Sequence, residues 1–156
     1  MDATGKSALL TTDRAELRPV TIEKTTRILI VEDDAMVATY IAEVLVESGF
    51  EVSGVASTGA EALMIAGIDG AHLALVDIKL SGPMDGIEVA RELRTQHSIG
   101  AIFLSGLDDP AILQRAAVAQ PLGFLQKPFL PSQVFNAINR ALRQSTKLAS
   151  RAPDFD

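Results

Sequence analysis

The stretch Leu-Ala-Leu-Val-Asp at residues 73–77 places four apolar residues directly before a carboxylate. An unbroken apolar run of this length is typical of a β-strand that is buried on both faces of a sheet. Such a strand would carry the Asp77 side chain to the edge of the sheet. A single carboxylate after an apolar run is also compatible with a helix cap or a solvated loop end. The rest of the sequence therefore has to decide what Asp77 does.

Four more apolar runs accompany this stretch, and a helical pattern follows each of them. The runs lie at 27–31, 51–56, 101–104 and 122–125, and the central strand is expected at 72–77. Residues typical of helix ends bound the helical stretches: Gly49, Thr58 with Glu61, Asp85 with Glu88, Asp109 with Pro110, and Pro131. Five alternations of strand and helix predict an α/β fold, a doubly wound five-stranded parallel sheet with helices on both faces.

Length and composition limit the possible functions. A chain of 156 residues forms about one domain, and 47% hydrophobic against 22% charged residues excludes a wholly disordered chain. No apolar run is long enough to span a bilayer, and the first 26 residues do not resemble a secretory signal, so we expect a soluble cytoplasmic protein. The absence of cysteine excludes thiolate chemistry. A net charge of -6 argues against a nucleic-acid interface and favours protein partners or a small cation.

Polar residues capable of chemistry lie at the ends of four predicted strands. Glu32 and Asp33 follow the first strand, Asp77 ends the third, Ser105 follows the fourth and Lys127 follows the fifth. The carboxyl ends of parallel strands share one edge of the sheet, where the binding sites of such folds form. We therefore expect these five side chains to be neighbours.

Three carboxylates at one edge need a counter-charge, since a single pair about 4 Å apart repels by roughly 4 kcal/mol at an effective dielectric of about 20. Their oxygen ligands favour a hard divalent cation, and an open, hydrated site favours Mg²⁺. The cation, the Lys127 amine and the Ser105 hydroxyl would hold a phosphoryl group for attack by Asp77. The alternative is a cluster of helix caps and surface ion pairs.

Taken together, these motifs resemble the receiver domain of two-component response regulators over about residues 27–145. The matching stretches are Ile-Leu-Ile-Val-Glu32-Asp33-Asp34, Leu-Val-Asp77-Ile-Lys-Leu, Met-Asp85-Gly86, Phe-Leu-Ser105-Gly and Phe124-Leu-Gln-Lys127-Pro128-Phe129. The resemblance implies a flavodoxin-like (CheY-like) sheet with strand order 2-1-3-4-5. We expect the receiver domain at 26–146, between a flexible N-terminal extension at 1–25 and a tail at 147–156, because neither end has a core-forming pattern.

The resemblance also implies a role for each acidic residue. Asp77 would accept a phosphoryl group from a phosphohistidine on a histidine kinase or a histidine phosphotransfer protein. Mg²⁺ would be held by Asp33, Asp77 and the backbone carbonyl of Lys79. Glu32 would act on the cation through water.

Four further expectations follow from the resemblance at the last two strands. Ser105 would contact the phosphoryl group after transfer, and Lys127 would pair with it. The Lys127–Pro128 peptide bond would be cis, which the base rate of roughly 5–6% for X-Pro bonds does not predict. Phe124 matches the aromatic switch position, which moves inward together with the hydroxyl of Ser105; the alternative is an ordinary core aromatic residue.

The sequence departs from the common receiver pattern at two places. The loop from Asp77 to Gly86 is one residue longer than usual and has Ser81 where proline is common. Ser105 and Gly106 replace the more usual Thr-Ala pair, which keeps a hydroxyl but makes the backbone after it less restricted.

After Lys127 the sequence leaves room for one helix and a tail, so we expect a stand-alone receiver and not an enzyme. It would relay phosphate or bind a downstream protein target, with no nucleic acid or membrane as partner. One alternative is a phosphorylation-independent scaffold with the same fold. A flavodoxin-like nucleotide binder is disfavoured because Glu32 and Asp33 would repel the ligand. A haloacid-dehalogenase-type phosphatase is disfavoured because Lys79 occupies the place of its second aspartate.

Overall fold

The structure is a computed structural model that describes residues 25–106 and 109–151, with side chains described as far as residue 144. The extension expected at 1–25 lies outside the described residues except for residue 25, and so does the end of the expected tail, 152–156. Among the described residues, no helix combines the length and apolar character needed to cross a bilayer.

Strands and helices alternate along the described chain. The elements are β1 (Arg27–Val31), α2 (Ala35–Glu47), β2 (Glu51–Ala56), α3 (Gly59–Ile68), β3 (Leu73–Asp77), α4 (Gly86–His97), β4 (Gly100–Ser105), α5 (Pro110–Val118), β5 (Gly123–Gln126) and α6 (Pro131–Arg151). All strand pairs are parallel and the sheet order is β2-β1-β3-β4-β5, which confirms the predicted fold and strand order.

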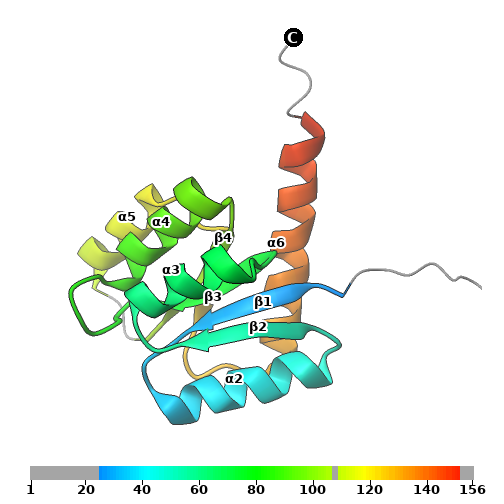
Figure 1. Cartoon of the computed structure of the whole chain (residues 1–156), viewed down its shortest axis with the longest axis horizontal. Helices are drawn as coiled ribbons and strands as arrows, with labels where there is room; N and C mark the ends of the chain where they lie inside the picture. The colour runs from blue at the N-terminus through cyan, green and yellow to red at the C-terminus, as the bar shows by residue number, and fades with distance from the viewer. Residues whose placement is uncertain (1–24, 107–108, 152–156) are drawn as a thin grey trace, which may run out of the picture.

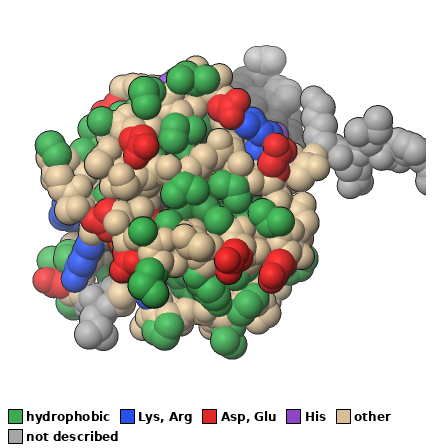
Figure 2. Space-filling model, turned by 60° about the horizontal axis from the view of Figure 1, so that its bottom comes forward, with side chains coloured by type: hydrophobic (Ala, Val, Ile, Leu, Met, Phe, Trp, Pro, Cys, Tyr) green, Lys and Arg blue, Asp and Glu red, His purple; other side chains and the backbone are tan. Residues whose placement is uncertain are grey.

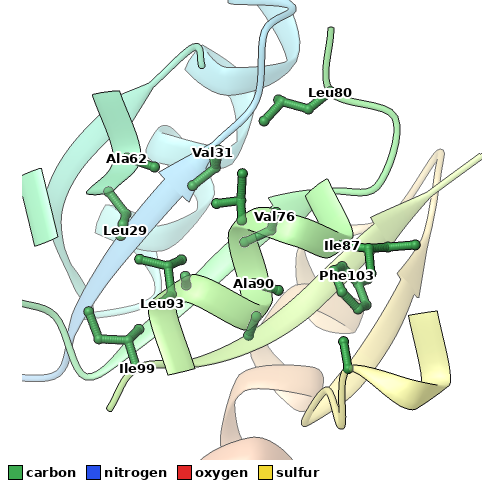
Figure 3. Close-up of a cluster of buried hydrophobic side chains, with 14 of the residues drawn as sticks. Leu29, Val31, Ala62, Val76, Leu80, Ile87, Ala90, Leu93, Ile99 and Phe103 are labelled. Atoms are coloured by element: carbon green, nitrogen blue, oxygen red, sulfur yellow. The ribbon is translucent and has the colours of Figure 1, made fainter. Parts of the chain in front are cut away.

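Helices cover both faces of the sheet, with α3, α4 and α5 on one side and α2 and α6 on the other (Figure 1). Because side chains alternate along a strand, Leu29 and Val31 pack toward α3 and α4, whereas Ile28 and Ile30 pack toward α2 and α6. Figure 3 shows the first of these two clusters. Full burial of one such side chain contributes about 1.5–3 kcal/mol, so both faces hold the central strands in place.

The helix starts follow the capping residues of the sequence, but the capping box that the spacing of Thr58 and Glu61 suggests is only half formed. Asp85 and Glu88 cap α4 as expected, and they do so as a reciprocal capping box. The pair Thr58 and Glu61 forms only half of one: the Thr58 side chain accepts from the Glu61 amide, but the Glu61 carboxylate accepts from Ser57. The Glu61 carboxylate therefore binds Ser57, the residue before the N-cap Thr58, and not Thr58 itself.

Helix α6 extends to Arg151 and so passes the domain boundary expected near residue 146. The expectation used the lack of a core-forming pattern, which detects burial and not helix formation. Residues 145–151 contain several strong helix formers and no Gly or Pro, and Pro153 is the next helix-breaking residue. Helix propensity thus explains why the helix outlasts the amphipathic pattern.

Candidate functional site

The carboxyl ends of four neighbouring strands bring the five predicted residues together. Pairing of β1 with β3, β3 with β4 and β4 with β5 places these ends side by side at one edge of the sheet. Glu32 and Asp33 follow β1, Asp77 and Ser105 are the last residues of β3 and β4, and Lys127 follows β5. Among the residues that the structure describes, the buried polar or charged ones are Glu32, Asp77 and Ser105.

The Lys127 amine lies between two carboxylates. Its Nζ atom is 2.9 Å from Oε1 of Glu32 and 3.4 Å from Oδ2 of Asp77. Glu32 is only 2% exposed, and its other oxygen accepts a hydrogen bond from the Asp34 amide at 3.1 Å. Glu32 thus forms a direct ion pair with Lys127. The resemblance did not suggest this pair, because it gave Glu32 only a role on the cation through water.

The electrostatic environment changes the pKa of three of these groups. Burial raises the pKa of Glu32, and its hydrogen bond with Lys127 opposes that rise only in part. Burial alone would lower the pKa of Lys127, but the hydrogen bond to Glu32 and the charge of Asp77 outweigh it and raise the pKa. Hydrogen bonds from Ser81 lower the pKa of Asp33. These directions favour the charged form of the Lys127 amine and the ionised form of Asp33.

The carboxylates form an oxygen-lined group suited to a small cation. Glu32, Asp33 and Asp77 each offer an oxygen, and these oxygens lie within 4.8 Å of one another. Two of the side chains are buried and Asp33 is exposed, so protein oxygens and water would both be available to a cation. This donor set fits Mg²⁺, which binds through a few carboxylates and keeps several waters. The Lys79 amide donates to Oδ1 of Asp77 at 3.2 Å, and the role of the Lys79 carbonyl stays a prediction.

A small pocket opens beside the Asp77 carboxylate. It has a volume of about 150 Å³, and its lining includes Asp77, Ser105, Lys127, Lys79 and Ile112 of α5. Ordinary small-molecule sites occupy roughly 300–1,000 Å³, so this pocket suits a phosphoryl group better than a nucleotide. The nucleotide-binder alternative finds no support here.

Phe124 is not an ordinary core residue. Its side chain is 45% exposed, and its ring lies 5.9 Å from the ring of the fully buried Phe103. Phe124 and Ser105 line a common hollow together with Leu113 of α5. The switch role of Phe124 stays a prediction, and the alternative of a buried core aromatic is wrong for this structure.

Two residues at the site, Asp34 and Ser81, were not predicted from the sequence to contact the acidic residues. Asp34 caps α2 by accepting from the amides of Met36 and Val37, while its own amide donates to Glu32. Ser81 donates to Asp33 from the loop between β3 and α4. The run of three acidic residues was a signal for the helix cap, since Asp is a preferred capping residue. No local pattern marks Ser81 as a partner of a residue 48 positions away.

The ion pair of Lys127 gives a prediction for stability. Replacing Lys127 with Gln should lower the free energy of unfolding of the Mg²⁺-free protein by about 2 kcal/mol, below the usual cost of breaking a buried pair because the lysine is partly exposed. Added Mg²⁺ should stabilise the variant more than the wild type, because a cation replaces the lost positive charge. Urea unfolding with and without Mg²⁺ measures both effects.

The control for this experiment is Arg91→Gln, which changes an exposed cation on α4 that does not line the Asp77 pocket. It should alter stability by no more than about 0.5 kcal/mol. An equal response of Lys127→Gln and wild type to Mg²⁺ would contradict the assigned electrostatic role.

The sequence is similar to those of known response regulators. A family model described as the response regulator receiver domain matches residues 28–139. The chain is 33% identical over 117 residues to the chemotaxis protein CheY of Bacillus subtilis, which covers 74% of this chain and 97% of that protein. It is 31% identical over 124 residues to the transcriptional regulatory protein PdtaR of Mycobacterium tuberculosis, covering 80% of this chain. The chain spans 60% of the length of that second relative.

Solved structures show the same similarity. The signal receiver domain of a modulated diguanylate cyclase from Desulfovibrio desulfuricans matches with a TM-score of 0.76 and 32% identity, over 79% of this chain and 98% of that one. A CheY-like response regulator receiver domain protein from Methanospirillum hungatei matches with a TM-score of 0.71 and 27% identity, over 80% and 98% of the two chains.

Proposed function

The chain belongs to the response regulator receiver domain family, and on that premise we propose that Asp77 accepts a phosphoryl group from a phosphohistidine of a partner protein. The observation that carries this proposal is the pocket beside Asp77, where one carboxylate oxygen lies 3.4 Å from the Lys127 amine and Ser105 is part of the wall. The Asp77 carboxylate, the charged Lys127 amine and the Ser105 hydroxyl thus surround a space of the right size for one phosphoryl group.

The proposed transfer assigns a task to each group. An oxygen of Asp77 forms a bond to phosphorus as the bond between phosphorus and the histidine nitrogen breaks, and the electron pair of that bond returns to the imidazole. Lys127 pairs with the negative charge of the phosphoryl oxygens, and Ser105 donates a hydrogen bond to them. Mg²⁺, held by Asp33, Asp77 and, through water, Glu32, would offset the remaining negative charge when bound.

The partner would dock on an apolar groove that adjoins this site. The groove has a volume of about 750 Å³ and is lined by residues of α2, of the segment after β5 and of the segment just after β4: Met36, Val37, Tyr40, Lys127, Pro128, Phe129 and Gly106. Figure 2 shows hydrophobic side chains gathered on the face to which α2 contributes, with acidic side chains among them. Because Lys127 borders both the groove and the Asp77 pocket, a helix in the groove would lie beside the acceptor.

We further propose that the protein signals through protein contacts and is not an enzyme for another substrate. The net charge of -6 supports a protein partner over nucleic acid. Phosphorylation adds a charge of about -1.5 to -2, which would change the packing near Ser105 and Phe124. A cytoplasmic location and a histidine kinase or phosphotransfer protein as phosphate source belong to the same proposal.

Incubation with acetyl phosphate and Mg²⁺ tests the proposed function. Intact-mass spectrometry should detect one phosphoryl adduct, and chelation of Mg²⁺ should prevent its formation. Absence of the adduct at saturating Mg²⁺, together with tight binding of a partner by the unmodified protein, would instead favour a phosphorylation-independent scaffold.

The groove gives a second prediction. Met36→Ala should slow phosphotransfer from a phosphorylated partner at least fivefold, because truncating an exposed anchor at an interface commonly costs about 1 kcal/mol or more. The rate of labelling by acetyl phosphate should not change, because the small donor does not need the groove. Rates measured with both donors separate the two effects.

Met64→Ala is the matched control, since Met64 is a half-exposed methionine of α3 that does not line the groove. It should leave both rates unchanged. Equal loss of rate in Met36→Ala with both donors would refute docking at this groove.

A further inference from the structure

The loop between β3 and α4 contacts Asp33 through Ser81, the residue that departs from the common receiver pattern. The backbone amide and the hydroxyl of Ser81 both donate to Oδ2 of Asp33, at 3.1 Å and 2.6 Å. The shorter of the two distances is typical of a hydroxyl bonded to an ionised carboxylate. Ser81 stands where proline is common in the receiver pattern, and a proline could supply neither the amide hydrogen nor the hydroxyl.

These hydrogen bonds restrict a side chain that is otherwise held weakly. Asp33 lies in the short segment between β1 and α2, and its side chain is exposed. Two donors on one oxygen fix the rotation of the carboxylate about its side-chain bonds. Both donors use Oδ2, so neither of them occupies Oδ1.

The loop that presents Ser81 is itself anchored at several points. Leu80 is 5% exposed and belongs to the core cluster, and Figure 3 shows it extending inward from the loop. The Lys79 amide donates to Asp77, and the Gly86 amide donates to the Ile78 carbonyl at 3.0 Å. Because its neighbours are fixed, Ser81 holds Asp33 from a defined position and does not move freely with it.

We propose that Ser81 is a positioning residue for the Mg²⁺ site, whose hydroxyl holds Asp33 in the orientation that binds the cation. The affinity for Mg²⁺ then depends on the longer loop between β3 and α4 as well as on the three carboxylates. This inference rests on the proposed function, because it assumes that the carboxylates hold Mg²⁺. Partners that orient a ligand of a metal ion typically change its affinity about 10- to 100-fold when removed.

Isothermal titration calorimetry with Mg²⁺ tests this role in the full chain. Ser81→Ala removes the hydroxyl and should weaken Mg²⁺ binding about tenfold, the lower end of the usual range because the amide donor remains. Ser81→Thr keeps a hydroxyl and should bind Mg²⁺ within about twofold of wild type. Without Mg²⁺, Ser81→Ala should lower the midpoint of thermal unfolding only slightly, because the lost hydrogen bond is exposed. A purely structural role of the hydroxyl would lower this midpoint and leave the affinity for Mg²⁺ unchanged.

The control is Ser57→Ala. Ser57 also directs its amide and its hydroxyl to one carboxylate oxygen, that of Glu61, at 2.8 Å and 3.2 Å. Glu61 is not among the three clustered carboxylates, so this variant should bind Mg²⁺ as wild type does. Equal affinity of Ser81→Ala and wild type would overturn the inference while leaving the Mg²⁺ site intact. Failure of wild type to bind Mg²⁺ would overturn the site and the inference together.

Discussion

Asp77→Asn should take up no phosphoryl group from acetyl phosphate under conditions in which the wild type forms one adduct. The Asn side chain has nearly the same shape and can still accept the hydrogen bond that the Lys79 amide donates to Oδ1. An amide oxygen is a poor nucleophile and cannot form the acyl phosphate, so the loss should be complete and not partial. Intact-mass spectrometry of both proteins in the presence of Mg²⁺ measures the result.

Asp69→Asn is the matched control for this experiment. Asp69 is the C-cap residue of α3, and its exposed carboxylate pairs with Arg27 at 3.0 Å, at the opposite edge of the sheet. This variant should form the adduct as wild type does. Persistence of the adduct in Asp77→Asn would show that another side chain is the acceptor, and the assignment of Asp77 would be wrong.

Gly86→Ala should cause the largest loss of stability among glycine-to-alanine changes in the described part of the chain. A Cβ atom at Gly86 would lie 1.9 Å from the Asp77 carbonyl oxygen and 2.8 Å from the Ile78 Cα. These are backbone atoms at the end of β3, so they cannot move aside as a flexible side chain does. Overpacking of this kind costs about 3 kcal/mol or more of the free energy of unfolding. Urea unfolding at 25 °C measures it.

Gly67→Ala serves as the control and should change the free energy of unfolding in the opposite direction. A Cβ at Gly67, inside α3, meets only His97 at an ordinary contact distance of 3.7 Å. Because Gly is unfavourable inside a helix, this change should stabilise the protein by about 0.5–1 kcal/mol. If Gly86→Ala were as stable as wild type, the close approach of α4 to the end of β3 would not exist in solution.

The part of the site that the sequence predicts is the part that depends on strand order. The apolar run before Asp77 indicates a buried strand, and alternation of strands with helices makes the strands parallel. Parallel strands end at one edge, so the closeness of Asp77, Ser105 and Lys127 follows without any knowledge of side-chain conformation. This argument needs only the period of the pattern and the order of the elements.

The parts that sequence does not predict depend on side-chain direction and loop conformation. The direct pair between Glu32 and Lys127 joins residues 95 positions apart, and a strand-end argument places them near each other without deciding whether water lies between. The hydrogen bonds from Ser81 to Asp33 depend on the path of a loop with no repeating pattern. In the same way, hydrophobic periodicity finds the buried part of α6 but not its end at Arg151.

The most direct test of the central claim is a crystal structure of the protein with Mg²⁺ and beryllium fluoride, a stable substitute for the transferred phosphoryl group. We predict that beryllium is bonded to a carboxylate oxygen of Asp77, with the Lys127 amine and the Ser105 hydroxyl in hydrogen-bond contact with its fluorines. The cation should contact Asp33 and Asp77. A structure with beryllium fluoride bound to another side chain, or with Lys127 turned away from Asp77, would contradict the account.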